Sequence, residues 1–144
     1  MAVVHPVDSN ALLGAIEAAQ AGLIIPVLVG PQDKIQAVAL AHDIDLSPYR
    51  IVLTEHSHAA AEQAVALARA GEVDAVMKGS LHTGELMHAA LAPSIGLSTA
   101  RRMSHVFVEG VPSYPRPLLI TDTVLNIYPD LEAKKHIVQN ATMK

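Results

Sequence analysis

Short runs of β-branched residues alternate along the chain with alanine-rich stretches whose apolar side chains recur at helical spacing. The pattern predicts strands over residues 2–5, 23–29, 50–54, 74–78, 103–109 and 117–121. It predicts helices that begin near residues 8, 31, 57, 83 and 129. This order favours an α/β fold built as a three-layer, open, mostly parallel sheet with helices on both faces.

Cap and breaker residues set the expected ends of these elements. Ser57 is placed to cap the helix over 57–69, and Gly71 to end it. Pro31 suits the first helical position, because its missing N–H would have no partner there. No repeat, low-complexity tract or linker interrupts the order of elements, so we predict a single α/β domain over 1–144.

The composition limits the classes of partner. Lys and Arg number 10 against 14 Asp and Glu, which gives a net charge of −4, and aromatic residues are only 3% of the chain. A nucleic acid would meet neither a cationic surface nor a base-stacking platform, so we expect none. No apolar run approaches the ~20 residues of a membrane helix, so we expect no membrane contact. Cysteine is absent and no signal-peptide pattern is present, so we expect a cytoplasmic protein.

The segment 77–87 (MKGSLHTGELM) leaves a predicted strand, turns at Gly79 and enters a helix. In open α/β sheets, ligands bind at this carboxyl end of a strand. Amides at the strand end and helix start, the hydroxyls of Ser80 and Thr83 and the ammonium of Lys78 suit a phosphate. The spacing is not that of an ATP-binding loop. A tight turn with a plain helix cap explains the same residues, so both interpretations stay open.

Two further groups of polar residues flank predicted strands. Arg101 and Arg102 precede one strand, and a guanidinium matches phosphate oxygens with two donors. Asp122 ends another strand, and Asn126 follows it. The alternatives are a solvated arginine pair and a turn in which Asp122 accepts from backbone amides.

Histidines number eight, and His56 and His58 are spaced as two metal ligands could be. No third ligand such as cysteine lies nearby, so we expect no metal site. His82 and His105 lie inside the polar segments above, where substrate binding or proton transfer is open to them. A core or capping role is the alternative.

Three segments carry a resemblance to known proteins: 77–83 (MKGSLHT), 96–106 (GLSTARRMSHV) and 119–131 (LITDTVLNIYPDL). In this order they resemble the phosphate acetyl/butyryltransferase family, and the earlier segment 22–30 (GLIIPVLVG) fits as well. The likeness covers nearly the whole chain. Within the family, the chain resembles phosphate butyryltransferase-like members more than acetyl-specific ones.

The resemblance implies exchange of an acyl group between coenzyme A and orthophosphate, with acyl-CoA and phosphate as substrates and no metal or redox cofactor. It does not identify the catalytic residue, for which His82 and Lys78 are the candidates. The residues expected to bind substrate or phosphate are Lys78, Gly79, Ser80, His82, Thr83, Arg101, Arg102, Ser104, Asp122 and Asn126. The implied fold is that of isocitrate and isopropylmalate dehydrogenases, present in part.

Family members are about twice as long, with two α/β domains and the active site between them. This chain matches their first half, so we expect a fragment of a longer enzyme. A half-site cannot position or desolvate substrates as a complete cleft does, which puts activity of the chain alone in doubt. We also expect apolar surface where the second half would pack, and therefore a homo-oligomer.

Two other classes of function fit some of these residues. One is a non-catalytic module that binds phosphate or CoA, or that assembles with another chain. The other is a metal- and NAD-dependent decarboxylating dehydrogenase, which shares the implied fold. The sequence shows no carboxylate cluster for the metal of such an enzyme.

Overall fold

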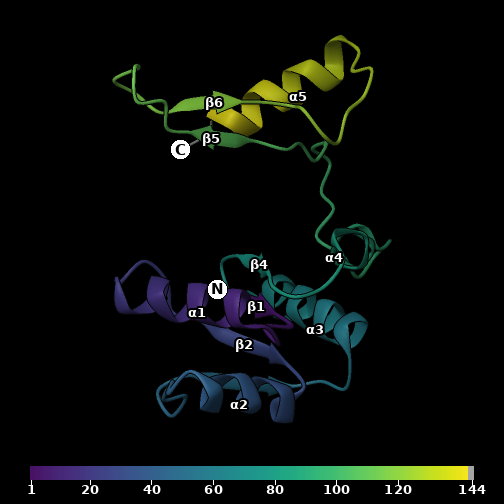
Figure 1. The fold of residues 1–144 in the computed structure, drawn as a ribbon. Coiled ribbons are helices and arrows are strands. Elements are labelled where there is room, and N and C mark those ends of the chain that lie inside the picture. Colours follow the sequence, from purple (N-terminus) through teal and green to yellow (C-terminus); the bar gives the residue numbers. More distant parts are fainter. Residues whose placement is uncertain (143–144) are drawn as a thin grey trace. The chain divides into compact units, whose positions relative to one another are not determined.

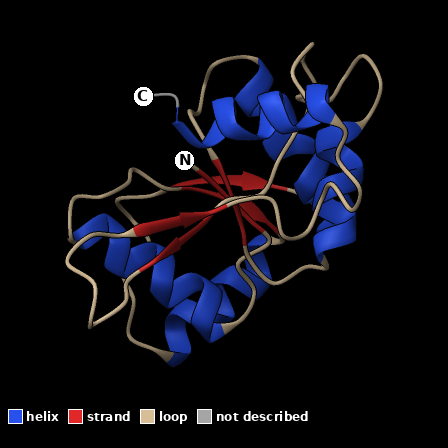
Figure 2. Ribbon diagram, turned by 90° about the horizontal axis from the view of Figure 1, so that it is seen from above, coloured by secondary structure: helices blue, strands red, loops and turns tan. Residues whose placement is uncertain are grey.

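The computed structural model describes residues 1–142 (Figure 1). They form two compact units, one of Met1–Leu97 and one that begins at Ser98. Strands and helices alternate through the first unit, as the apolar pattern predicts (Figure 2). The single domain over 1–144 stays a prediction. None of the described helices is long and apolar enough to cross a membrane.

Four parallel strands form the sheet of the first unit, in the order β3-β2-β1-β4. They are β1 (Ala2–Val4), β2 (Val27–Gly30), β3 (Arg50–Leu53) and β4 (Val76–Lys78). Val3 of β1 pairs with Leu28 on one side and with Met77 on the other. Because the strands are parallel, all their carboxyl ends meet at one edge of the sheet.

Helices cover both faces of this sheet. They are α1 (Ser9–Gln20), α2 (Gln32–Ala41), α3 (Ser57–Arg69) and α4 (Thr83–Leu91). Side chains alternate along a strand, so Val3 and Leu28 pack on one face with buried residues of α1 and α2. Val4 and Val29 pack on the other face with buried alanines of α3 and α4. The predicted α/β class, with a parallel sheet between helices, is confirmed.

The second unit contains a two-stranded sheet and one helix. Strands β5 (Phe107–Glu109) and β6 (Leu118–Ile120) are antiparallel, and α5 is Leu131–Thr142. Both strands are shorter than predicted, and among residues 98–142 each pairs with no strand but the other. The proline-rich connection over 110–117 is too short for the crossover that a parallel pair requires, so the chain folds back as an antiparallel pair.

Several element ends differ from the sequence-based expectation. β2 begins at Val27, because Leu23 and Ile25 are exposed. Pro31 is the N-cap of α2 rather than its first helical residue. The N-cap of α3 is His56, whose Nδ1 accepts from the N–H of Ala59 at 3.2 Å, and not Ser57.

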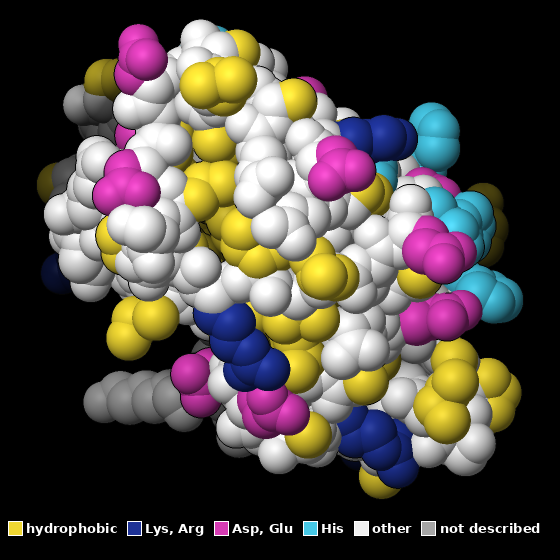
Figure 3. All heavy atoms as spheres, turned by 90° about the horizontal axis from the view of Figure 1, so that it is seen from below, with side chains coloured by type: hydrophobic (Ala, Val, Ile, Leu, Met, Phe, Trp, Pro, Cys, Tyr) yellow, Lys and Arg dark blue, Asp and Glu magenta, His cyan; other side chains and the backbone are white. Residues whose placement is uncertain are grey.

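Large apolar side chains are exposed in both units. In the first unit Leu40 is 82% exposed, and in the second Ile127 and Tyr128 are 82% and 97% exposed. Figure 3 shows one face on which hydrophobic side chains gather, while histidines lie beside acidic side chains at its margin. Such surface agrees with the expected apolar area, and self-association stays a prediction.

Candidate functional site

The carboxyl edge of the parallel sheet holds a pocket of about 520 Å³. Here β1 ends next to β4, and the loop that follows β4 leads into α4. The pocket is lined by His5, Asp8, Ser57, Lys78, Gly79, Ser80, Leu81, His82 and Glu85. The structure therefore brings together most of the residues predicted in segment 77–83, and Thr83 lies just beyond them as the first residue of α4.

The backbone of the loop is fastened to the end of β1. Gly79 donates its N–H to the carbonyl of Val4, and Ser80 donates to the carbonyl of His5, each at 2.9 Å. His5 Nδ1 lies 2.8 Å from the carbonyl oxygen of Ser80. The amides of Gly79 and Ser80 are thus occupied, contrary to the expectation that amides at the strand end face a ligand.

The ammonium of Lys78 stabilises the same loop through hydrogen bonds. Its Nζ donates to the carbonyl of Leu81 at 3.0 Å and to that of Gly79 at 3.3 Å. A lysine ammonium has three N–H donors, so one of them is left for a ligand. Lys78 can therefore fix the loop and contact an anion at the same time.

Carboxylates also face this pocket. Asp8 is the N-cap of α1, and the N–H of Ala11 first and the Ser80 hydroxyl next hold its pKa below the usual value, with the charge of Lys78 helping. Together with Glu85, the lining residues carry two carboxylates against one ammonium. An anion here must rely on fixed N–H and O–H donors. The nearest such amides are those of Thr83 and Gly84, which lie just beyond the lining residues and have no helical acceptor because they belong to the first turn of α4.

Sequence reasoning missed His5, Asp8, Ser57 and Glu85 as lining residues of this pocket. A signal for two of them existed. His5 ends the first predicted strand and Asp8 follows it, and the carboxyl ends of neighbouring parallel strands lie together. The sequence does not show that β1 lies beside β4, and this strand order is what makes His5 and Asp8 neighbours of Lys78.

The second unit brings four other predicted residues together. Arg102 Nη1 donates to Asn126 Oδ1 at 3.3 Å, and the amide of Asn126 donates to Asp122 and to the carbonyl of Met103. Asn140 of α5 joins this network, since its Nδ2 donates to Ser104 Oγ and to the carbonyl of Arg102, both at 2.9 Å. The network holds the segment before β5 against α5. Asn140 was not predicted.

Arg101 and Arg102 line a smaller hollow of about 350 Å³ with Thr99, Ala100 and His136. His136 Nδ1 accepts from the N–H of Arg102 at 3.1 Å. Two guanidinium groups at one hollow suit a phosphate group. His105 does not line this hollow but lies beside Asp122: its carbonyl accepts from the Thr121 hydroxyl at 2.6 Å, and its backbone helps to lower the pKa of Asp122. Its ring is edge-on to Phe107 at a centroid distance of 4.3 Å.

Asp122 is held as a carboxylate by the turn that follows it. Burial alone would raise its pKa, but the N–H groups of Leu125 and Val124, each 3.0 Å from Oδ1, and the Asn126 amide hold the pKa well below its usual range. This is the backbone-accepting turn named as the alternative for Asp122 in the sequence, and it does not exclude a ligand at Asn126.

This lowered pKa predicts acid sensitivity of the second unit. The stabilisation is complete above the pKa of the unfolded state, about 3.9, and is lost as the pH falls toward the lower folded value. Asp122→Asn should destabilise the unit by about 1 kcal/mol at neutral pH, because solvent screens part of the interactions of this partly exposed carboxylate, and should flatten its stability between about pH 5 and 2. Amide resonances of α5 followed in thermal melts at several pH values measure this. Parallel pH curves for the two proteins would contradict it.

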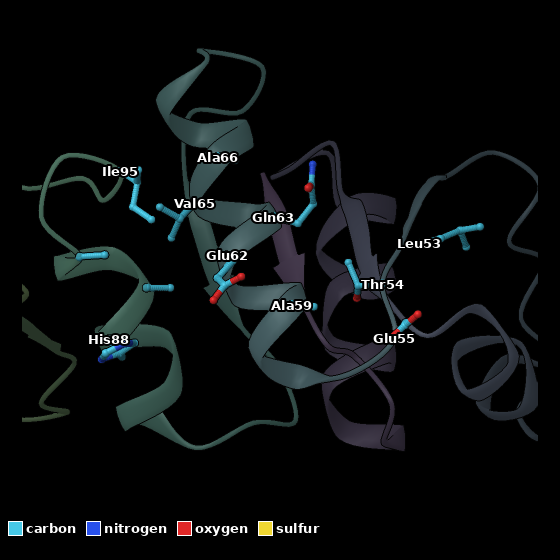
Figure 4. Close-up of a pocket in the computed structure, with 12 residues that line it drawn as sticks. Leu53, Thr54, Glu55, Ala59, Glu62, Gln63, Val65, Ala66, His88 and Ile95 are labelled. Atoms are coloured by element: carbon cyan, nitrogen blue, oxygen red, sulfur yellow. The ribbon is translucent and has the colours of Figure 1, made fainter.

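A second groove in the first unit, of about 570 Å³, lies along α3 (Figure 4). Leu53, the last residue of β3, and Glu55 just after it border the groove. Glu62 projects from α3, and His88 projects from α4. The hydroxyl of Thr54 is buried at this groove without a hydrogen-bond partner among the described residues. No described group of three or more His, Asp or Glu side chains could hold a metal ion.

The chain that carries these two clusters is similar to a known protein family. The family model described as Phosphate acetyl/butaryl transferase matches residues 53–144. The chain is 58% identical to a phosphate acetyltransferase of Rhizobium meliloti over 96% of its own length and 44% of the relative. It is 54% identical to a phosphate acetyltransferase of Rickettsia typhi over 97% of its length and 40% of the relative.

A phosphate butyryltransferase of Clostridium acetobutylicum is 35% identical over 98% of the chain and 47% of that relative. The expected greater likeness to butyryltransferase-like members is therefore wrong. The three segments that carried the resemblance lie inside the region matched by one model for both kinds of enzyme, so they do not separate them. The chain spans less than half the length of each of these relatives.

Both the Lys78 loop and the Arg102 network lie within the matched region, in the order that the resemblance requires. By this match and these identities, the chain belongs to the phosphate acetyl/butaryl transferase family.

Proposed function

We propose that this chain carries part of the active site of a phosphate acyltransferase. In the reaction, an oxygen of orthophosphate attacks the carbonyl carbon of an acyl-CoA thioester. The carbon–sulfur bond breaks as the carbon–oxygen bond forms, giving acyl phosphate and CoA. The observation that carries the proposal is the family match over 53–144, which contains the Lys78 loop and the Arg102 network.

The chemistry needs donors where negative charge collects, on the phosphate and on the thioester oxygen. In the first unit, the third N–H of Lys78 and the amides that begin α4 supply such donors, while the hydroxyl of Ser80 is engaged by Asp8. His82 lines the same pocket and is exposed, so its ring can give a proton to the leaving sulfur or take one from phosphate. In the second unit, Arg101 and Arg102 suit the phosphates of CoA.

Several wider features belong to the same proposal. The substrates are acyl-CoA and phosphate, CoA acts as substrate, and the reaction needs no resident cofactor. The protein works in the cytoplasm as a homo-oligomer, without nucleic acid or membrane as partner. Its parallel sheet belongs to a fold of the isocitrate and isopropylmalate dehydrogenase kind.

The direct test is an acyl-phosphate assay with hydroxylamine trapping. The chain is assayed with acetyl-CoA or butyryl-CoA and phosphate, alone and mixed with a protein that supplies the remaining part of a full-length relative. Acyl hydroxamate formed in either arrangement supports the proposal. No product in any arrangement, with phosphate or CoA binding retained in calorimetry, favours the non-catalytic binding module instead.

The arginine pair gives a separate prediction for a full-length enzyme that contains this sequence. Lysine keeps the charge but loses the planar pair of donors, so Arg101→Lys or Arg102→Lys should lower kcat/KM about tenfold or more while the melting temperature stays within a few degrees. Steady-state kinetics beside melting curves measure this. If the kinetics of both variants match the parent, the arginines do not bind substrate.

A further inference from the structure

Glu85 lies where the beginnings of α3 and α4 meet, and its carboxylate has three partners. Oε1 accepts from the Ser57 hydroxyl at 2.7 Å and lies 3.0 Å from His58 Nδ1. Oε2 accepts from the N–H of His82 at 2.8 Å. The Ser57 hydroxyl first, and the His82 N–H next, lower the pKa of Glu85, so the group is a carboxylate near neutral pH. Its side chain is only 15% exposed.

These contacts exceed those of an ordinary helix cap. In a capping box, a glutamate in the first turn accepts from the N-cap N–H of its own helix, as Glu85 does for His82. Here the other oxygen binds Ser57, the first residue of a different helix. One carboxylate therefore joins the start of α3, the start of α4 and the last residue of the Lys78 loop.

The other loop residues are fastened by different groups. Gly79 and Ser80 are held by carbonyls of β1, and Leu81 is held by Lys78. The N–H of His82 is bound instead by the side chain of Glu85, which also contacts α3. Since Ser57, His82 and Glu85 all line the 520 Å³ pocket, the contacts of Glu85 set the distance between two of its walls.

We propose that Glu85 is a positioning residue for phosphate binding in this pocket. It holds the first turn of α4 and His82 against α3, so that the amides of Thr83 and Gly84 stay directed at the anion. The inference rests on the proposed function, because it assigns the anion to the phosphate substrate. The negative charge of Glu85 also repels a nearby anion, so removing the charge would strengthen phosphate binding. Loss of the positioning contacts would weaken phosphate binding, so variants of Glu85 can separate the two effects.

The test is a titration of the 144-residue chain with inorganic phosphate, followed by amide NMR shifts over residues 78–85. In Glu85→Ala, we expect phosphate to bind about tenfold more weakly, because misplaced donors lose much of their binding energy. In Glu85→Gln, the side-chain oxygen can still accept from the His82 N–H, so the loss should be at most about threefold. Glu17→Ala, at an exposed glutamate of α1, is the matched control and should bind phosphate as the parent does.

Phosphate affinity that is equal or tighter in both Glu85 variants would overturn the inference, because charge repulsion would then be the main role of Glu85. If Glu85→Ala does not fold, the double variant Ser57→Ala/His58→Ala decides in its place. It removes both side chains of α3 that contact Glu85 and should weaken phosphate binding about threefold, and unchanged affinity would overturn the inference. If the parent chain shows no phosphate shifts while the full-length enzyme transfers acyl groups, this inference is wrong and the proposed function stands. If acyl transfer is also absent, the proposed function itself has failed.

Discussion

Replacing Gly79 with alanine should lower the unfolding free energy of the first unit by about 3 kcal/mol. A Cβ at this position would lie 2.4 Å from the carbonyl oxygen of Val4 and 3.1 Å from that of His5. Both are backbone atoms at the end of an internal strand, so no side-chain rotation relieves the clash. The loop would have to leave β1 and lose the hydrogen bonds of Gly79 and Ser80. Urea unfolding followed by circular dichroism should show a lower midpoint.

Gly84 provides the matched control for this substitution. It lies five residues further along the same segment, inside α4, and an added Cβ would meet nothing within 4 Å. Gly84→Ala should leave the midpoint unchanged or raise the stability by up to about 1 kcal/mol, because alanine favours a helix over glycine. Equal midpoints for the two variants would show that the loop does not approach β1 as closely as described.

Leu28→Ala should also cost about 3 kcal/mol, through a cavity rather than a clash. Leu28 is fully buried in β2 and packs with Leu12 of α1 and Ile35 of α2. The neighbours belong to regular elements on one face of the sheet, so they cannot collapse fully into the space. Leu40→Ala, at a residue of α2 that is 82% exposed, should change stability by less than about 0.5 kcal/mol. Similar losses for both leucines in urea unfolding would argue against this core.

The helices of the first unit could be predicted because their signals are local. α4 begins at Thr83 as expected, and Gly71, after the end of α3, takes the positive φ of 73° that glycine permits. The errors fall where a distant neighbour decides. Leu23 and Ile25 are as apolar as the residues of a strand but have no strand beside them. The residues of β5 and β6 are typical of strands, but their sequence does not predict that the two strands pair with each other.

The candidate site divides in the same way. The Lys78 loop could be located because a glycine turn after a buried strand and before a helix is visible in the sequence. Its hydrogen bonds could not be predicted, since the acceptors of Gly79 and Ser80 belong to β1, at the other end of the unit's sequence. Asp8 and Glu85 each help to cap the start of their own helix, α1 and α4. Only the pairing of β1 with β4 and the packing of α3 beside α4 place the two carboxylates in one pocket.

The strand order β3-β2-β1-β4 has a consequence for how the chain is made on the ribosome. β1 is synthesised first, yet Ala2 pairs with Val76, so one edge of this strand stays open until β4 has emerged. An open strand edge is a template for pairing with other chains, so nascent chains that end before Lys78 should be prone to aggregation and should bind chaperones. Because the amides of Gly79 and Ser80 bond to the end of β1, the candidate pocket is among the last parts of the first unit that translation allows to form.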